Sequence, residues 1–144
     1  MIKRSAVVVL GGLLCLCGLQ GVRAADFDEL SKYLAFIEGF QHMFEFCQAE
    51  TKLPADQVSF ARQHIGERRS LIFAGLDEAQ RDRISADAQP KKKQMLAGVM
   101  DYMKKNGHEK PLRELCREGF FAGIVESEKN GEAKEVAAIQ KAKN

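Results

Sequence analysis

Apolar residues recur at every third or fourth position through most of the chain, the spacing that places them on one face of an α-helix. The clearest example runs from about residue 28 to residue 48, where one stripe consists of Leu30, Tyr33, Leu34, Ile37, Phe40, Phe44 and Cys47. No segment alternates strictly between apolar and polar residues, as a half-buried strand would. The pattern therefore predicts an all-α fold, a small bundle of four to five helices.

Prolines, glycines and capping residues divide the rest of the chain. Pro54 suits the first turn of a second helix, and Gly75 suits its end. Asp77 with Gln80 resembles the capping box of a third helix. Pro90 then interrupts an otherwise helical stretch. Because proline lacks an amide hydrogen and clashes with the preceding turn, we expect a break there rather than a kink.

Two further helices are expected after Pro90. The first carries an apolar stripe and closes at Asn106-Gly107, and the second opens at Pro111. The inner side of that second helix would carry Leu112, Cys116, Phe120 and Ile124. Asn130-Gly131 is expected to end the packed region. Residues 132–144 contain few large apolar side chains, so we predict a frayed helix or a disordered, charged tail there.

The first 24 residues follow a different plan. Lys3 and Arg4 precede a nearly unbroken apolar run of about 14 residues, and Val22 and Ala24 stand where a signal peptidase reads small side chains. The run is shorter than the ~20 residues that a membrane-spanning helix needs. We therefore predict a signal peptide over residues 1–24, a helical domain over 25–131 and the tail over 132–144. The protein would be secreted or periplasmic, without stable membrane insertion after cleavage; an uncleaved N-terminal anchor is the alternative.

The charge of the chain changes when this segment is removed. The full sequence has 22 basic and 20 acidic residues, and Lys3, Arg4 and Arg23 are the only charged residues before residue 25, so 19 basic and 20 acidic residues remain. A nearly neutral protein has no general electrostatic attraction to polyanions. Nucleic acid is therefore not an expected partner.

Cleavage would also leave two of the four cysteines, Cys47 and Cys116. Cysteines of exported proteins usually pair because the compartment is oxidising. We predict a Cys47–Cys116 disulfide that joins the first and last major helices; two separate buried thiols are the alternative.

The search for chemistry returns few candidates. The sequence contains no zinc-helix, di-iron, phosphate-loop or nucleophile-elbow motif, and no Cys-x-x-Cys pair. His42 shares a helix face with Glu38 and Glu45, which could bind a metal, but a solvent-facing histidine is the simpler interpretation. His64 and His108 have no ligand-like neighbours along the chain. We expect no enzyme activity, no metal and no cofactor. Lys91-Lys92-Lys93 is interpreted as a solvated run of charge, or else as a contact patch for an acidic partner.

Phenylalanines are more numerous near the two cysteines than a small core requires. Adjacent helical residues point about 100° apart, so Phe120 and Phe121 cannot both face one small core, and neither can Phe46 and Cys47. Phe36 also widens the stripe of the first helix. Phe36, Phe46, Phe120 and Phe121 are therefore the candidate partner-binding residues, unless surrounding helices bury both sides.

Taken together, these features predict an exported, non-catalytic binding protein. Its partner would be a protein or peptide docked in an apolar groove, as for a secretion accessory, chaperone or immunity protein. A carrier of a small apolar ligand or haem in the bundle core is the alternative. The oligomeric state does not follow from the sequence.

Overall fold

The computed structural model describes residues 25–108 and 110–144, which form five α-helices and, over those residues, no strand. The helices are α1 (Phe27–Glu50), α2 (Ala55–Phe73), α3 (Glu78–Lys105), α4 (Leu112–Arg117) and α5 (Phe120–Lys143). The predicted all-α bundle is confirmed. The predicted signal peptide, residues 1–24, lies outside the described residues.

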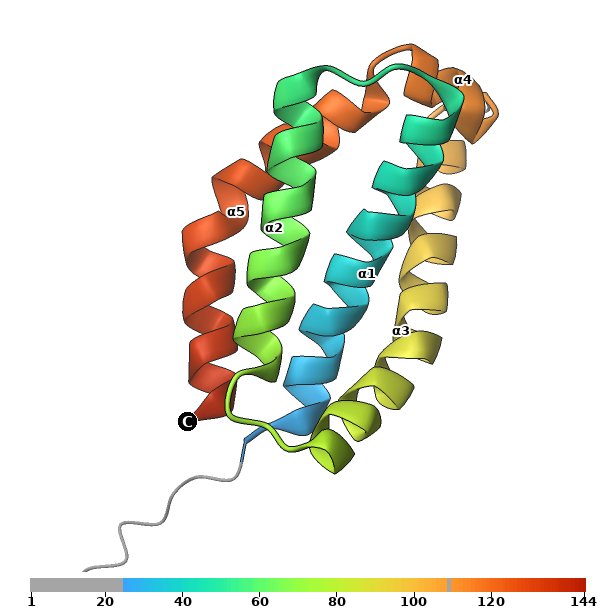
Figure 1. Cartoon of the computed structure of the whole chain (residues 1–144). Helices are drawn as coiled ribbons and strands as arrows, with labels where there is room; N and C mark the ends of the chain where they lie inside the picture. The colour runs from blue at the N-terminus through green and yellow to red at the C-terminus, as the bar shows by residue number, and fades with distance from the viewer. Residues whose placement is uncertain (1–24, 109) are drawn as a thin grey trace, which may run out of the picture.

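Helix α1 is the central element of the bundle. It packs against each of the other four helices, α2 also packs against α5, and α3 packs essentially against α1 alone (Figure 1). The two long helices α3 and α5 therefore lie on different sides of α1 and make at most marginal contact with each other. This arrangement leaves part of the surface of α1 between them uncovered.

Two apolar clusters hold the bundle together. The cluster at the α1 N-terminal end contains Leu30, Leu34, Ile72, Ile84, Ala88 and Ile139. The cluster at the α1 C-terminal end contains Phe40, Phe44, Cys47, Ala61, Cys116, Phe121 and Val125. The stripe predicted for the first helix faces these clusters, which explains why α1 lies in the middle.

Helix ends largely follow the predicted signals. The Asp77 carboxylate accepts from the Gln80 amide at 2.8 Å and the Gln80 side chain accepts from the Asp77 amide at 3.0 Å, so the capping box is confirmed. Gly75 takes the left-handed conformation, with φ 74°, directly after α2. The helix predicted to start at Pro111 is instead divided in two, because Gly119 has φ 90° and separates α4 from α5.

The predicted break at Pro90 is wrong. Pro90 lies inside α3, which continues through it to Lys105 and curves along α1 (Figure 1). Proline removes the hydrogen bond to the carbonyl of residue 86, and both Ala86 and Pro90 are exposed. Water can therefore satisfy that carbonyl, and packing on α1 keeps the helix continuous.

The predicted tail over residues 132–144 is also wrong. Helix α5 continues past Gly131 to Lys143, and Ile139 is completely buried in the cluster around Leu30. The amide of Asp26 donates to the carbonyl of Ala142 at 2.7 Å, which ties the end of α5 to the start of α1. One buried isoleucine and small neighbours are enough to dock this segment, so its low apolar content gave a misleading signal.

The predicted disulfide is present. The sulfur atoms of Cys47 and Cys116 are at bonding distance, with their Cα atoms 5.1 Å apart, and the bond connects α1 to α4. Among the described residues, no helix combines the length and apolar character needed to cross a membrane.

Candidate functional site

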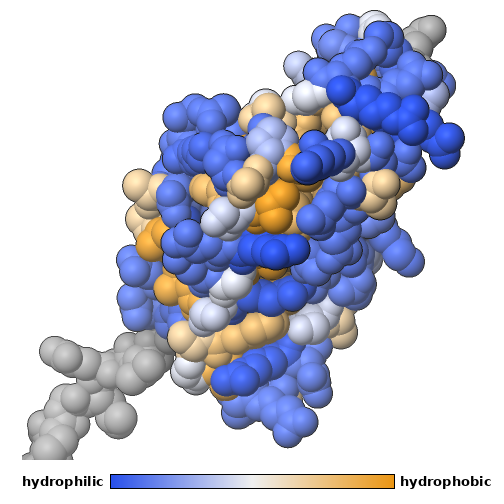
Figure 2. All heavy atoms as spheres, turned by 45° about the horizontal axis from the view of Figure 1, so that its top comes forward, coloured by the Kyte–Doolittle hydropathy of each residue, from blue (hydrophilic) through white to orange (hydrophobic). Residues whose placement is uncertain are grey.

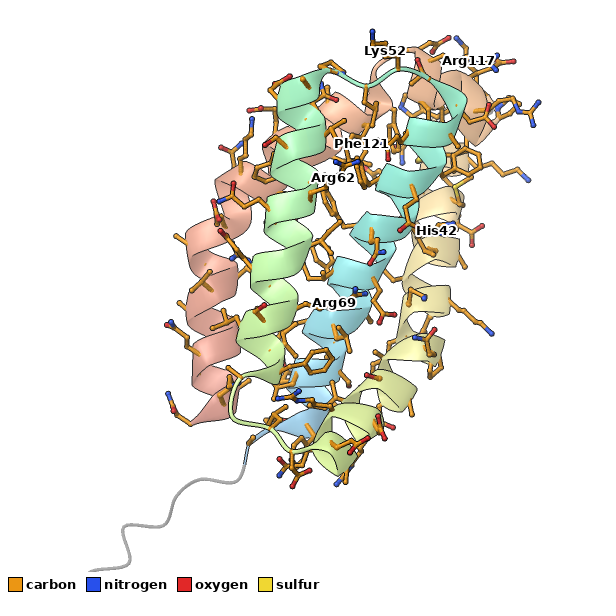
Figure 3. The ribbon with its side chains drawn as sticks, in the orientation of Figure 1. His42, Lys52, Arg62, Arg69, Arg117 and Phe121 are labelled. Atoms are coloured by element: carbon orange, nitrogen blue, oxygen red, sulfur yellow. A yellow bond between two sulfur atoms is a disulfide. The ribbon has the colours of Figure 1, made fainter. Side chains whose placement is uncertain are left out.

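Two parts of the α1 surface border α3, one facing α2 and the other facing α5, and they differ in polarity. The side toward α2 is polar: Arg69 donates to Gln41 at 2.9 Å, and Lys92 pairs with Glu38 at 3.2 Å. Figure 3 shows Arg69 reaching from α2 toward α1. Gln89 also donates to Glu38, at 2.9 Å. Polar links from both flanking helices therefore cover this side.

The opposite side of α1, between α3 and α5, is an apolar groove. Its section nearer the disulfide has a volume of about 240 Å³ and is lined by Phe36, Gly39, Phe40, Met43, Met95, Leu96, Val99, Phe120 and Ile124, with Ser127 and Glu128 at its edge. Phe36 is 41% exposed. This section and a second one closer to the α1 N-terminus together form what we call the groove.

The groove continues along α1 toward its N-terminus. This second section has a volume of about 540 Å³ and shares Phe36, Ser127 and Glu128 with the first. Its other lining residues are Glu29, Lys32, Tyr33, Gly131, Lys134, Glu135 and Ala138. From Glu29 to Met43 the groove follows α1 for about 21 Å at 1.5 Å per residue.

Helix α3 adds exposed apolar side chains beside the groove. Met95, Val99 and Tyr102 lie on one face of α3, at helical spacing. The most exposed large apolar residues described are Phe36, Val99, Met100 and Tyr102. On the face shown in Figure 2, hydrophobic residues show only in patches along the middle of the molecule, framed by hydrophilic ones. Exposed apolar residues gathered around a hollow are typical of a binding surface.

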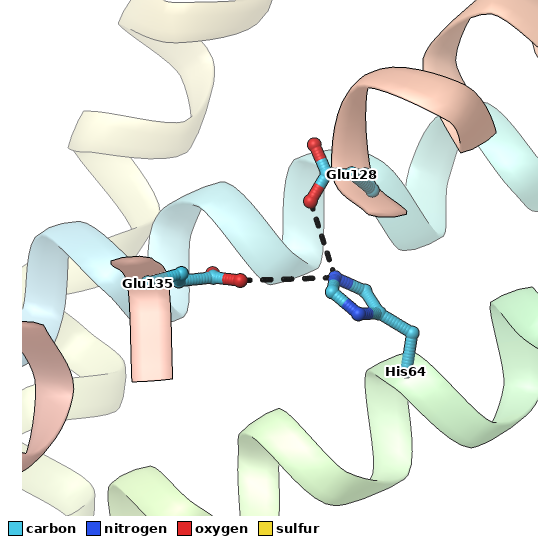
Figure 4. Close-up of side chains that lie close together, drawn as sticks. All are labelled: His64, Glu128 and Glu135. Carbon is cyan, nitrogen blue, oxygen red and sulfur yellow. Dashed lines mark hydrogen bonds and ion pairs between the residues drawn. The ribbon is translucent and has the colours of Figure 1, made fainter. Parts of the chain in front are cut away.

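A buried polar cluster lies behind the α5 wall of the groove. The Nε2 atom of His64, on α2, is 3.1 Å from a carboxylate oxygen of Glu128 and 3.9 Å from one of Glu135, both on α5 (Figure 4). The His64 side chain is only 1% exposed, and its ring packs against those of Phe40 and Phe60, with centroids 5.3 and 5.2 Å away. Because Glu128 and Glu135 also line the groove, they connect it to His64.

Arg68 completes this cluster one turn after His64. Its guanidinium donates to Glu135 at 3.1 Å and to Glu132 at 2.8 Å. Burial raises the pKa of the Glu135 carboxyl, and Arg68 opposes that shift. The cluster therefore holds α2 against α5, with His64, Arg68, Glu128 and Glu135 largely buried and Glu132 partly exposed.

Two buried atoms of the cluster have no hydrogen-bond partner among the described residues. They are Nδ1 of His64 and Oε1 of Glu135. Unpaired buried polar atoms are rare and costly, so each one calls for a physical explanation.

The candidate partner-binding residues have different positions. Phe36 and Phe120 line the groove, so the structure brings these two together. Phe46 is half-buried against the cluster around Cys47. Phe121 is completely buried among Phe40 and Phe44, so the prediction that it contacts a partner is wrong. Its cluster combines residues of α1, α2, α4 and α5, and this packing does not follow from the sequence.

Most of the other candidates from the sequence make contacts within the bundle. His42 is exposed on α1 (Figure 3). Glu38 binds Lys92, and Glu45 accepts from Gln41. The three residues on that face therefore do not form a common site. In the lysine run, Lys91 pairs with Asp28 at 2.6 Å and Lys92 with Glu38, so two of its members join α3 to α1.

Sequence reasoning missed the His64 cluster because its members come from two helices. A signal for it exists: Glu128, Glu132 and Glu135 recur at helical spacing, as do His64 and Arg68. The spacing indicates one polar face on each of two helices, but it does not indicate that these faces pack against each other inside the bundle. No protein-family model, no curated protein and no solved structure matches this chain.

Proposed function

We propose that this chain is an exported, non-catalytic binding protein that holds an apolar helical segment of a partner protein in the groove. The observation that carries the proposal is the arrangement around Phe36. Helices α3 and α5 pack on α1 from different sides, and the side chains lining the space between them are mainly apolar. A bundle with such an uncovered face can complete its packing with a helix from another protein.

The shape of the groove favours a helix over a small ligand. It is open along its length and follows α1 for about 21 Å, which matches about 14 residues of helix. Small apolar ligands are usually enclosed over most of their surface. A helix with apolar residues at positions i, i+4, i+7 and i+11 would instead place one continuous stripe against Phe36 and its neighbours.

The groove wall suits a partner of variable sequence. Met43 and Met95 line the section nearest the disulfide, and unbranched thioether side chains adapt to irregular apolar surfaces. Gly39 allows close packing there, because a Cβ at that position would collide with the methyl group of Met95.

Two observations support the exported and non-catalytic parts of the proposal. The Cys47–Cys116 bond is typical of proteins in oxidising compartments, in agreement with the pattern of residues 1–24. His64 lines neither section of the groove, and its buried side chain contacts the rings of Phe40 and Phe60. A general base would have to reach a substrate directly or through a water.

The test is a selection of helical peptides on the oxidised domain from residue 25 onward, followed by fluorescence anisotropy with each selected peptide. We expect selected peptides to share an apolar stripe and to bind in the micromolar range. Phe36→Ala should weaken binding at least tenfold, which corresponds to about 1.4 kcal/mol. Ser127→Trp, which fills the point where the two sections meet, should abolish binding.

The matched control is Met100→Ala. Met100 is 41% exposed, as Phe36 is, but does not line the groove. Its removal should leave the affinity unchanged. Selected peptides that bind all three variants equally would contradict the proposal. Binding of a fatty acid in place of any peptide, lost in Ser127→Trp, would support the small-ligand carrier instead.

A further inference from the structure

We propose that His64, Glu128 and Glu135 bind a divalent transition-metal ion of the Zn²⁺ type. One donor atom from each residue lies within 4.8 Å of the others. His64 Nε2 lies 3.1 Å from Oε2 of Glu128 and 3.9 Å from Oε2 of Glu135. Donor atoms around a tetrahedral zinc ion, at 2.0–2.2 Å from the metal, lie about 3.3–3.6 Å apart. Small side-chain movements would therefore bring the three donors to metal-binding positions.

Glu135 has an oxygen available for such an ion. Its Oε2 accepts from Arg68, whereas its buried Oε1 has no partner among the described residues. Because the oxygen 3.9 Å from His64 is Oε2, the carboxylate must turn so that Oε1 faces the ion while Oε2 stays within reach of Arg68. Arg68 would then orient the carboxylate from behind, as hydrogen-bonding groups around metal ligands commonly do.

The charge balance also favours a cation. Metal binding requires His64 to be neutral. Among the described residues, Glu128 then has no cationic group within ion-pairing distance, and Glu132 and Glu135 share Arg68. Two of these carboxylates are largely buried. A divalent ion would neutralise their excess negative charge, which is costly to bury unpaired.

The donor types define the class of ion. One imidazole with two carboxylates suits zinc and its transition-metal neighbours better than Mg²⁺ or Ca²⁺, which prefer all-oxygen sites. Three protein ligands leave a fourth position for water. Since Glu128 and Glu135 line the groove, the ion would have a route from solvent.

The experiment is isothermal titration of the tag-free, oxidised domain from residue 25 onward with ZnCl₂, with MgCl₂ as the comparison. We expect one zinc ion per chain with micromolar or tighter affinity, and no response to magnesium. Co²⁺ should give the visible absorption of a four-coordinate site. Glu135→Gln should weaken zinc binding at least tenfold, since even loss of a group behind a metal ligand costs about 10–100-fold.

Glu132→Gln is the matched control. Glu132 lies on the same face of α5 and binds the same arginine, but it is 45% exposed and is not one of the three donors. It should retain wild-type zinc affinity. Circular dichroism shows whether Glu135→Gln folds. If it does not, Glu128→Gln is tested in its place. The proposal would be overturned if the wild type bound no zinc, if Glu132→Gln lost as much affinity as Glu135→Gln, or if Glu135→Gln kept the wild-type affinity. Peptide binding in the groove does not depend on the outcome.

Discussion

Cys47, in the last turn of α1, is bonded to Cys116 of α4, 69 positions later in the chain. Both residues lie in the apolar cluster that also contains Phe121. Helix α4 has only six residues, and an isolated helix of that length does not form in water. The disulfide therefore anchors a segment that has little stability of its own.

Reduction of this bond should destabilise the domain strongly. Closing a loop of this length stabilises a fold by roughly 4 kcal/mol in the chain-entropy model. Cys47→Ser should cost at least as much, because Cys116 is then unpaired and a hydroxyl takes the place of a fully buried sulfur. We expect Tm to fall by roughly 15 °C. Thermal melts with and without reductant are the measurement, and identical curves for the wild type would contradict the prediction.

Local signals predicted most of the helices because they depend on neighbouring residues. The stripe of α1, the glycine after α2 and the capping box at Asp77 each act within a few positions. The disulfide also followed from the sequence, since only two cysteines remain after residue 24. These features need no knowledge of how the helices pack.

The errors arose where packing between distant segments decides the outcome. Pro90 is tolerated because α1 supports α3 from one side and water reaches the other. The segment after Gly131 is ordered because Ile139 reaches the cluster around Leu30. For the same reason the groove and the His64 cluster could not be predicted: each consists of side chains from helices whose relative positions the sequence does not state.

Phe36 and Phe121 should respond very differently to truncation. Phe121 is 0% exposed and contacts Phe40 and Phe44, so Phe121→Ala should cost about 3–5 kcal/mol of unfolding free energy. Phe36→Ala should cost less than about 1 kcal/mol, because much of that ring already contacts solvent. Urea denaturation of the two variants and the wild type measures the difference. Equal losses would place Phe36 in the core and remove it from the groove.

Asp28 should make the stability of the domain depend on pH in the acidic range. Its carboxylate binds Lys32 at 2.8 Å and Lys91 at 2.6 Å, and the hydrogen bonds from these lysines lower its pKa from 3.8 to about 2. Because the folded pKa lies below the unfolded one, the contribution is present above about pH 4 and is lost as pH falls toward 2.

The comparison is Asp28→Asn, with Asp82→Asn as a control on the exposed surface of α3. Melting curves should be recorded at several values between pH 2 and pH 6. The gap between the wild type and Asp28→Asn should be widest at the upper end and close toward pH 2. A gap that stays constant with pH would show that Asp28 acts through shape rather than charge.

Lys143, at the end of α5, should stabilise the C-terminal end of α2. Its ammonium donates to the carbonyls of Leu71 at 2.9 Å and Ile72 at 3.1 Å, and also to that of Ala74. The last carbonyls of a helix have no partner within it, and a cation there also complements the helix dipole. Lys143→Met should therefore lower the free energy of unfolding by about 1–2 kcal/mol.

Lys141→Met is the matched control for this prediction, because Lys141 lies in the same last turn of α5 but is exposed. It should change stability by less than about 0.5 kcal/mol. Hydrogen exchange gives a second measurement: the last turn of α2 should lose protection in Lys143→Met and retain it in Lys141→Met. If both variants behave alike, the end of α5 does not cap α2, and the packing of Ile139 and the hydrogen bond from Asp26 to Ala142 must hold the last turns of the chain in place.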